Sequence, residues 1–406
     1  MNKKHIQKTN WNLIFLALII GVSVAGYIGK TPPAIPSIRI DLALSLVMAG
    51  WVVSIFSTMG SVTGMMAGMY ADRVGRVKII IYALILISFG SILGAYSNST
   101  TMLLFSRVIE GTGYIGTMAI LPALIAGLAS DRHRAFAVSL FSSVTPLGMA
   151  ITMIVAPLVI HQYGWRNLWW ITGIFTIAFL ILALIAFRGI DARTSRNKQP
   201  YWSNIKKTTS IPGPWLISIC FMTYTFQWYA IMVWLPTFVI EERGLELKLA
   251  AGLAAAAVTI NIFGNLFGAW LIHRGISRWI LISIGTFIMG LSSIFIFPNI
   301  LPDFLRFGLV LVFSFLGALQ PSAVMASVPI HSPTPAQLGS TNGLVYQGSQ
   351  IGHLFGPPVV AWFVTYTGVW NQIGWVLFMG TMLNLALAQW MRIIEKKSGD
   401  LNHCNQ

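Results

Sequence analysis

Three ionisable residues interrupt long apolar stretches of this sequence and could carry chemistry there: Lys30, Arg107 and Glu110. An ionisable side chain in an apolar membrane interior costs at least ~2.5 kcal/mol, so such residues are retained where they serve a function or reach the interface. Glu110 follows Arg107 by three positions and therefore shares nearly the same face of a helix. Two cations against one carboxylate leave a net positive site, which would suit an anionic ligand.

We interpret Lys30 and Arg107 as substrate-binding residues and Glu110 as a proton-coupling residue, because a buried carboxyl group can exchange a proton when its surroundings change. Two alternatives stay open. Arg107 and Glu110 could form an ion pair that only neutralises both charges. The long stem of Lys30 could instead carry its ammonium group to the membrane interface.

Amide side chains at other apolar positions could line the same site. We interpret Gln227 and Gln347 as further substrate-binding residues. Amides within membrane spans can equally serve to bond neighbouring helices, so that alternative applies to each of them. The same two interpretations apply to the other amides, which are Asn261, Asn265, Gln320 and Gln350. His353 could also line the site; it is interpreted as a structural histidine, with a proton relay as the alternative.

The composition indicates a protein that crosses a membrane many times. Of 406 residues, 56% are hydrophobic and 9% are charged, with a mean hydropathy of +0.74; soluble domains carry about 25% charged residues. A helix needs about 20 apolar residues to cross the hydrocarbon core. The sequence predicts an all-α integral membrane protein of twelve spans, near residues 12–38, 45–70, 78–97, 101–128, 135–160, 166–187, 214–240, 250–272, 279–298, 304–329, 340–365 and 371–391.

The positive charge follows the topology of the spans. A formal net charge of +15 would suggest nucleic-acid binding in a soluble protein, but here most Lys and Arg residues fall in the segments that are internal if the N-terminus is cytoplasmic. We therefore expect both termini in the cytoplasm and no nucleic-acid partner. The first apolar run is followed by Lys30-Thr31-Pro32-Pro33 rather than by a small-x-small cleavage site, which predicts an uncleaved first helix. Cys220 lies in a span and Cys404 in the tail, so no disulfide is expected.

The sequence repeats itself weakly with a period of 200 residues. Gly148 and Pro157 recur as Gly348 and Pro357, and other Gly and Pro residues share this offset. An even number of spans in each half gives both halves the same orientation, which is a parallel repeat. The predicted organisation is a cytoplasmic N-terminus (1–11), two six-helix halves (12–187 and 214–391), a cytoplasmic linker (188–213) and a cytoplasmic tail (392–406). The repeat also pairs Lys30 with Ala230, well inside an apolar run, and this favours a buried Lys30.

A charged turn occupies residues 68–78, with the sequence Gly-Met-Tyr-Ala-Asp-Arg-Val-Gly-Arg-Val-Lys. Its spacing resembles motif A of the major facilitator superfamily, which lies between the second and third spans of those transporters. The alternative is an ordinary tight turn with internal positive charges, and Asp72 argues against it. The resemblance implies that Asp72 lies against the start of the eleventh span, and that Arg76 pairs with Asp131 when the inner gate is shut. It implies a gating role for Gly68, Asp72, Arg73, Gly75, Arg76 and Asp131.

Residues 103–113 are similar to the fourth-helix motif of the same family, Arg-x-x-(Gln or Glu)-Gly-x-Gly, and include Arg107 and Glu110. Anion transporters of the family use cations of the first and fourth helices, and this pattern resembles theirs. Drug exporters of the family carry Gly-Pro-x-x-Gly-Gly at the end of helix five, whereas this chain has Ala-Pro-Leu-Val-Ile at 156–160. The chain therefore resembles the bacterial twelve-helix permeases for organic anions and metabolites.

Two predicted spans carry glycines at helical spacing, which lets helix backbones approach closely. They are Gly60, Gly64 and Gly68 in the second span and Gly348, Gly352 and Gly356 in the eleventh. In the resembled family these two helices face each other between the halves. The alternative is packing within one half.

The sequence contains no phosphate-binding loop, no His-Glu-x-x-His and no cluster of metal ligands, so we expect neither an enzyme nor a cofactor or metal. We predict a secondary transporter of the cytoplasmic membrane that moves a small organic solute, an anion by the charges, by proton-coupled alternating access. A transporter that exports drugs or metabolites by proton antiport is the alternative. The expected partners are the small-molecule substrate, protons and the lipid bilayer, and the expected state is a monomer.

Overall fold

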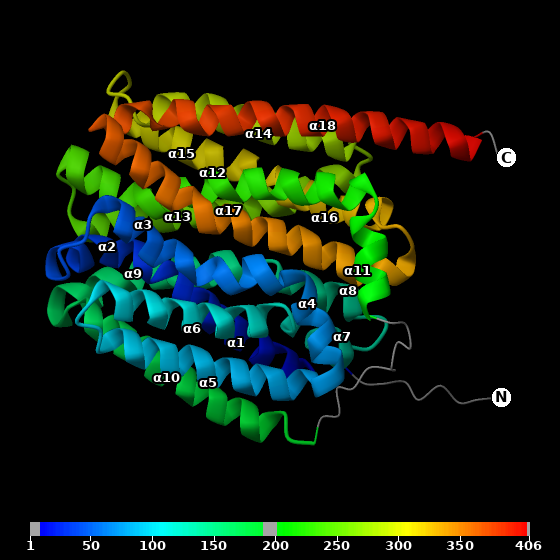
Figure 1. The fold of residues 1–406 in the computed structure, drawn as a ribbon, viewed down its shortest axis with the longest axis horizontal. Coiled ribbons are helices and arrows are strands. Elements are labelled where there is room, and N and C mark those ends of the chain that lie inside the picture. Colours follow the sequence, from blue (N-terminus) through cyan, green and yellow to red (C-terminus); the bar gives the residue numbers. More distant parts are fainter. Residues whose placement is uncertain (1–8, 190–200, 404–406) are drawn as a thin grey trace.

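The computed structural model describes the backbone of residues 9–189 and 201–403, and the side chains of these residues except 67–74, 135, 201, 335 and 396–403. Within this part of the chain every regular element is a helix. Figure 1 shows the long helices running side by side along one axis, with both ends of the chain at the same end of the bundle. An even number of spans requires this placement of the termini.

The first half contains six spans, several of which are divided into two helices. In chain order its elements are α1 (Trp11–Gly29), α2 (Thr31–Asp41), α3 (Leu46–Ser54), η1 (Ile55–Ser57), α4 (Thr58–Val74), α5 (Arg76–Ala95), α6 (Thr100–Met118), α7 (Leu121–Leu128), α8 (Arg134–Phe141), α9 (Val144–Tyr163) and α10 (Trp165–Ala186).

The second half repeats this plan with fewer breaks. Its elements are α11 (Tyr201–Thr209), α12 (Pro212–Arg243), α13 (Leu247–His273), α14 (Arg278–Ile296), α15 (Asp303–Gly317), α16 (Leu319–His331), η2 (Pro335–Gln337), α17 (Leu338–Thr367), η3 (Trp370–Gln372) and α18 (Ile373–His403). The prediction of an all-helical membrane protein with twelve spans in two halves is confirmed.

Eleven of the described helical segments are long and apolar enough to cross a membrane. The twelfth span is α17, which has 30 residues but carries polar side chains such as Gln347, Gln350 and His353. These polar groups are tolerated because α17 packs between α12 of its own half and α3 and α4 of the other half. A helix enclosed by other helices needs less apolar surface than one that faces lipid.

The first span is divided at Lys30, where α1 ends and α2 begins. After Thr31 come Pro32 and Pro33, and the first of them occupies one of the first two positions of α2. Proline is tolerated there because the first N–H groups of a helix have no intrahelical partner. Because the span continues through α2 to Asp41, Lys30 lies within it instead of at its outer end.

The main contacts between the halves are those of α3 and α4 with α17 and of α9 with α13. These helices belong to the second and eleventh spans and to the fifth and eighth spans, so the interface has the pseudo-twofold character expected of a repeat. Within each half the repeat is also visible in close packing. A Cβ at Gly148 would meet the Val22 carbonyl oxygen at 2.2 Å, and one at Gly348 would meet the Ser218 carbonyl oxygen at 2.6 Å. Only glycine allows these helices of the fifth and eleventh spans to approach the first and seventh so closely.

The linker and the tail contain more helix than the sequence predicted. Residues 190–200 of the linker lie outside the described part, but 201–209 form α11, and α12 begins at Pro212. The last helix continues to His403, through most of the predicted tail. Neither 201–209 nor 392–403 contains a proline. A helix can therefore form there although the apolar pattern of the spans has ended.

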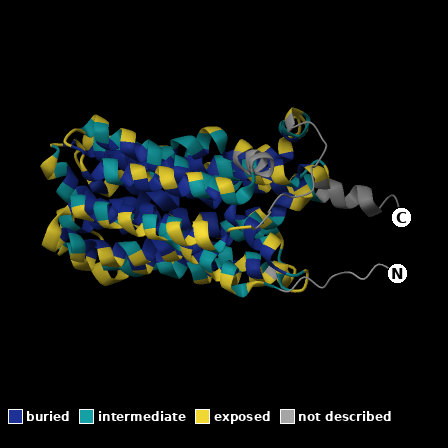
Figure 2. Cartoon of the chain, turned by 90° about the horizontal axis from the view of Figure 1, so that it is seen from below, coloured by how far each residue is buried: buried dark blue, intermediate teal, exposed yellow. Residues whose placement is uncertain are grey.

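Buried residues concentrate along the inside of the bundle (Figure 2). Many of the exposed residues on its outside are large and apolar. Phe105, Phe175, Phe287 and Trp362 are each more than half exposed. A girdle of large exposed apolar side chains would be unfavourable in water and matches the hydrocarbon of a bilayer.

Candidate functional site

Lys30 lies inside the first half and reaches neither the membrane interface nor lipid. Its side chain is fully buried. The ammonium Nζ donates to Glu110 Oε1 at 2.7 Å, to Ser91 Oγ at 3.0 Å and to Thr172 Oγ1 at 3.2 Å. The interpretation that Lys30 extends to the interface is therefore wrong in this structure, because all three hydrogen atoms of the ammonium group find partners at mid-span.

Aromatic rings complete the surroundings of Lys30. The Nζ atom lies 4.2 Å from the ring centroid of Tyr27 and 4.4 Å from that of Trp169. Cation–π contacts of desolvated ammonium groups contribute about 2 kcal/mol. The partners of Lys30 come from α1, α5, α6 and α10, all within the first half.

Glu110 bridges the two cations. Its Oε1 accepts from Lys30, and its Oε2 accepts from Arg107 on the preceding turn of α6. The carboxylate is fully buried. The neighbouring helix α5 makes room for it with Gly90, where a Cβ would meet the Glu110 backbone nitrogen at 2.8 Å and its Cγ at 2.9 Å.

Arg107 is held from three sides. Besides its ion pair with Glu110, Nε donates to the Val52 carbonyl at 3.2 Å and Nη2 to the Tyr27 carbonyl at 3.4 Å. The guanidinium carbon lies 4.5 Å from the ring centroid of Phe56. Carbonyls of the first and second spans thus fix the orientation of a fully buried guanidinium.

With all three groups ionised, the cluster of Lys30, Arg107 and Glu110 has a net charge of +1. The sequence left open whether Arg107 and Glu110 only pair with each other or also bind a substrate. The ion pair between them does form. It does not neutralise the site, because Lys30 joins the same carboxylate. A buried unit of positive charge remains, and a charge in such surroundings is costly unless another group compensates it.

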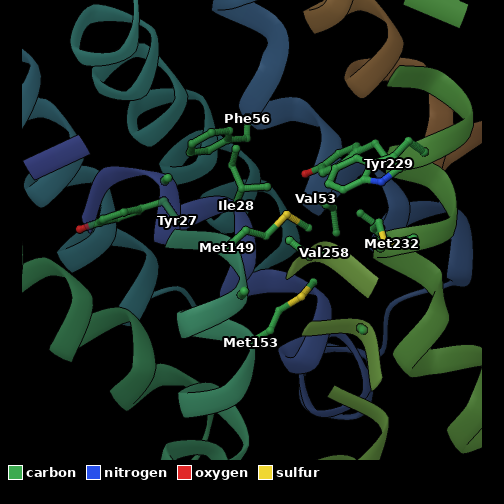
Figure 3. Close-up of a cluster of buried hydrophobic side chains, with 14 of the residues drawn as sticks. Tyr27, Ile28, Val53, Phe56, Met149, Met153, Tyr229, Met232 and Val258 are labelled. Carbon is green, nitrogen blue, oxygen red and sulfur yellow. The ribbon is translucent and has the colours of Figure 1, made fainter. Parts of the chain in front are cut away.

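The second half presents aromatic side chains toward this cluster. Arg107 packs on Phe56 of η1, and η1 contacts α17 of the second half. Across the interface, the ring centroid of Tyr229 on α12 is 4.5 Å from that of His353 on α17. Figure 3 shows the Tyr229 hydroxyl directed toward Phe56 and Ile28 of the first half. Arg107, unlike Lys30, therefore borders the boundary between the halves.

Apolar side chains close the interface around this point. Met149 and Met153 of α9 lie near Met232 of α12 and Val258 of α13 (Figure 3), and all four are at most 1% exposed. Methionine side chains are flexible and repack readily around different shapes. The halves therefore meet through an adaptable apolar layer beside Arg107.

The two glutamines interpreted as substrate ligands occupy different surroundings. Gln227 is fully buried, donates to the Thr223 carbonyl at 3.3 Å and accepts from Thr381 at 3.1 Å. It faces α18 of its own half, away from the charged cluster. Gln347 donates to the Ser61 carbonyl at 2.7 Å, so it ties α17 to α4 across the interface. In this state both amides bond neighbouring helices.

The predicted packing glycines divide between the two interpretations. Cβ atoms at Gly60 and Gly64 would meet Gln350 at 2.6 Å and Gln347 at 3.0 Å, so these glycines lie at the interface between the halves. The three glycines of α17 instead face α12 within their own half. Their nearest neighbours are Ser218 for Gly348, Thr225 for Gly352 and Phe226 for Gly356.

The gating motif is described only in part. The side chains of Asp72 and Arg73 lie outside the described part, as do the surroundings of Gly68. Gly75 adopts a positive φ of 104°, a conformation suited to glycine, and so permits the tight turn between α4 and α5. Arg76 donates to the Ala123 carbonyl at 2.9 Å, and Asp131 pairs with Arg134 at 2.8 Å. The expected partnership of Arg76 and Asp131 when the inner gate is shut stays a prediction.

At the end opposite the termini, an ion pair joins the two halves. Arg39 of α2 contacts Glu241 of α12 at 2.5 Å, and both side chains are about one third exposed. Arg243 and Asp303 form a second pair at 3.4 Å at the same end, but both lie in the second half. Only the first of these two pairs must break if the halves separate there.

Reversing the charge of Arg39 should therefore favour opening at this end. We expect Arg39→Glu to slow transport two- to five-fold, since an exposed ion pair contributes up to ~1 kcal/mol. The double variant Arg39→Glu/Glu241→Arg should restore the rate, and Arg243→Glu should change it little. Turnover measured in proteoliposomes checks this, and a charge-swapped variant as slow as the single one would contradict it.

Sequence reasoning did not find Ser91, Thr172 or Trp169 as partners of Lys30. They lie 61 to 142 residues away along the chain, and no local pattern marks them. Tyr229 and His353 were visible as polar residues within spans, but nothing in the sequence placed them in contact with each other at the interface. The described residues contain no group of three or more His, Cys, Asp or Glu that could hold a metal ion.

Comparison with known proteins agrees with this architecture. The chain is 26% identical over 364 residues to a candidate niacin/nicotinamide transporter of Bacillus subtilis, covering 84% of this chain and 87% of that protein. It is 22% identical to a candidate sulfoacetate transporter of Cupriavidus necator, covering 91% and 92% of the two chains.

Among solved structures, the fold matches a bacterial homolog of the human lysosomal transporter Spinster in its inward-facing, unoccupied conformation. The TM-score is 0.75 with 18% identity, over 97% of this chain and 96% of that one. The sequence pattern of the Major Facilitator Superfamily matches residues 13–337. The protein is thus a multi-pass membrane transporter of small solutes rather than an enzyme, and the chain belongs to the Major Facilitator Superfamily.

Proposed function

We propose that this protein transports small organic acids together with protons by alternating access, with Arg107 contacting the acid and Glu110 carrying the proton. The observation that carries the proposal is the single buried carboxylate shared by two buried cations. One of these cations borders the boundary between the halves, where a substrate must pass in any alternating-access transporter of this fold.

The charges suggest how proton and acid could bind together. While Glu110 is ionised, it occupies the guanidinium of Arg107, and the cluster carries +1. Protonation of Glu110 would raise the net charge to +2 and release Arg107 from its ionic partner. The carboxylate of a substrate could then replace that of Glu110, forming a charge-assisted, bidentate contact.

This exchange couples the two ligands without a separate relay. Binding of the acid favours protonated Glu110, because a second carboxylate beside an ionised one is repelled. Protonation in turn favours binding of the acid, as linkage requires. A monoanion and a proton would cross together with no net charge, so both would move in the same direction.

We assign Lys30 a positioning role. It is saturated by hydroxyls and by Glu110 inside the first half, so it would hold the carboxyl group of Glu110 in place rather than contact the acid. Its positive charge also adds to that of Arg107 when Glu110 is protonated, which favours binding of an anion. This differs from the interpretation made from sequence, in which both cations contact the substrate.

The movement itself would use the contacts between the halves. The pair of Arg39 with Glu241 closes one end in this structure, and Gly60 and Gly64 provide a smooth surface on which α17 can slide past α4. We propose that Asp72 and the rest of the charged turn control the opposite end. We also propose that the protein lies in a bacterial inner membrane and that the end holding both termini faces the cytoplasm. Most basic residues belong to that end.

The names of two relatives support an acidic substrate. The first name gives niacin, a pyridine carboxylic acid, together with its neutral amide nicotinamide. Sulfoacetate carries both a sulfonate and a carboxylate. An Arg contact suits either anionic group, since guanidinium pairs with planar and tetrahedral oxyanions alike.

Uptake into proteoliposomes tests the proposal. The panel would comprise niacin, its neutral amide nicotinamide, sulfoacetate and benzoate, each with and without an imposed pH gradient. We expect at least one acid to accumulate when the exterior is more acidic, and accumulation to collapse with a protonophore. Transport of only neutral or cationic compounds, or acid transport indifferent to the gradient, would refute the corresponding half of the proposal.

A further inference from the structure

The linker contains a short helix that no part of the transport mechanism uses. This helix, α11, has nine residues with the sequence Tyr-Trp-Ser-Asn-Ile-Lys-Lys-Thr-Thr and no acidic side chain. Figure 1 shows it at the end of the bundle that holds the termini, oriented across the direction of the spans. It immediately precedes α12, so it lies where that span leaves the hydrocarbon core.

One face of α11 is fixed to the bundle. Thr208 is fully buried, and its hydroxyl lies 2.5 Å from that of Ser340 in the first turn of α17. Asn204 accepts from Gln337 at 2.8 Å. The Trp215 indole donates to the Thr209 carbonyl at 3.0 Å. The helix is therefore an anchored element with a defined orientation.

The remaining surface combines cations with aromatic side chains. Lys206 and Lys207 are exposed, Trp202 is 65% exposed and Trp215 is 44% exposed. Tryptophan at the boundary of a span is typical of the headgroup region, where its ring is apolar and its N–H remains hydrated. Lysines beside such rings can hold their stems along the apolar layer and their ammonium groups at the level of phosphates.

We propose that α11 is a binding site for the headgroups of anionic phospholipids, in the membrane leaflet at the end that holds the termini. Lys206 and Lys207 would contact the phosphate and the anionic headgroup, while Trp202 and Trp215 lie beside the upper part of the acyl chains. A free phosphate ion could use the lysines but would gain nothing from the aromatic rings. This site is independent of the transported substrate and of its coupling to protons.

Crosslinking in a bilayer tests the site. The full-length protein would be reconstituted into nanodiscs of phosphatidylcholine containing a titrated fraction of a photoactivatable phosphatidylglycerol. Crosslinked peptides would then be quantified by mass spectrometry. We expect crosslinks to the peptide containing residues 201–215 to saturate at a low phosphatidylglycerol fraction. In Lys206→Gln/Lys207→Gln the required fraction should rise about 30-fold, which corresponds to ~1 kcal/mol for each lysine near an anionic surface.

Three comparisons make the test specific. Lys206→Arg/Lys207→Arg should behave as wild type, and Lys248→Gln, an exposed lysine at the other end of the bundle, should leave the 201–215 crosslink unchanged. A phosphatidylcholine probe should crosslink this peptide weakly in all variants. Equal phosphatidylglycerol crosslinking in the double Gln variant would overturn the proposal. Complete competition by inorganic phosphate at equal concentration would also overturn it, in favour of a site for free anions.

Discussion

Arg107→Gln should weaken binding of the transported acid roughly 10- to 150-fold, because it removes a charge-assisted contact worth about 1.5 to 3 kcal/mol. The fold should survive this change. Glu110 keeps its bond to Lys30, so the remaining pair is neutral, and the glutamine amide can still donate to a nearby carbonyl. Binding is measured by titration calorimetry or by a thermal-shift series with the acid found in the uptake panel.

The matched comparison is between an acid and its amide. Arg107→Gln should lose the preference for niacin over nicotinamide, or for the corresponding acid of another pair, while neutral ligands should be unaffected. Lys30→Met has the same effect on net charge but leaves the Arg107 guanidinium in place, so it should keep that preference. An unchanged acid affinity in a folded Arg107→Gln protein would exclude Arg107 as the substrate contact.

Glu110→Gln should abolish proton-driven accumulation, but as a single change it should also destabilise the protein. It leaves Lys30 and Arg107 as two buried cations without a counter-charge, and breaking a buried ion pair in this way costs about 3–5 kcal/mol. Loss of transport in this variant alone would therefore not separate coupling from folding. Thermal unfolding of the purified variant measures the structural part of the effect.

The double variant Lys30→Met/Glu110→Gln separates the two contributions. It keeps the net charge at +1 and retains Arg107. The hydroxyls that contact Lys30 stay satisfied, since Ser91 donates to the Trp169 carbonyl at 2.8 Å and Thr172 to the Leu168 carbonyl at 2.9 Å.

We expect this double variant to be more stable than Glu110→Gln and to catalyse counterflow of the acid, yet to fail to accumulate it under a pH gradient. Counterflow and gradient-driven uptake in the same proteoliposome preparation provide the measurement. Gradient-driven accumulation at the wild-type level would show that another group carries the proton.

The sequence by itself determined the number of spans, their helical character and their arrangement in two halves. These features depend on the length of apolar runs, which must match the thickness of a bilayer, and on the short loops between them. It also located the three residues of the charged cluster, because an ionisable residue within an apolar run can be recognised without knowing how the run packs. It missed α11 and the continuation of α18, since polar helices at the ends of spans have no apolar pattern to mark them.

Only the tertiary structure decided which neighbours these residues meet. Helical periodicity gives the face of a residue but does not identify the helix opposite that face. For this reason the sequence could not tell that Lys30 turns into the first half, or that Gln227 faces α18 while Gln347 reaches α4. The same ambiguity affected the glycines, of which Gly60 and Gly348 serve different interfaces. Contacts between residues 80 or more positions apart, such as that of Lys30 with Glu110, arise only when the spans pack together.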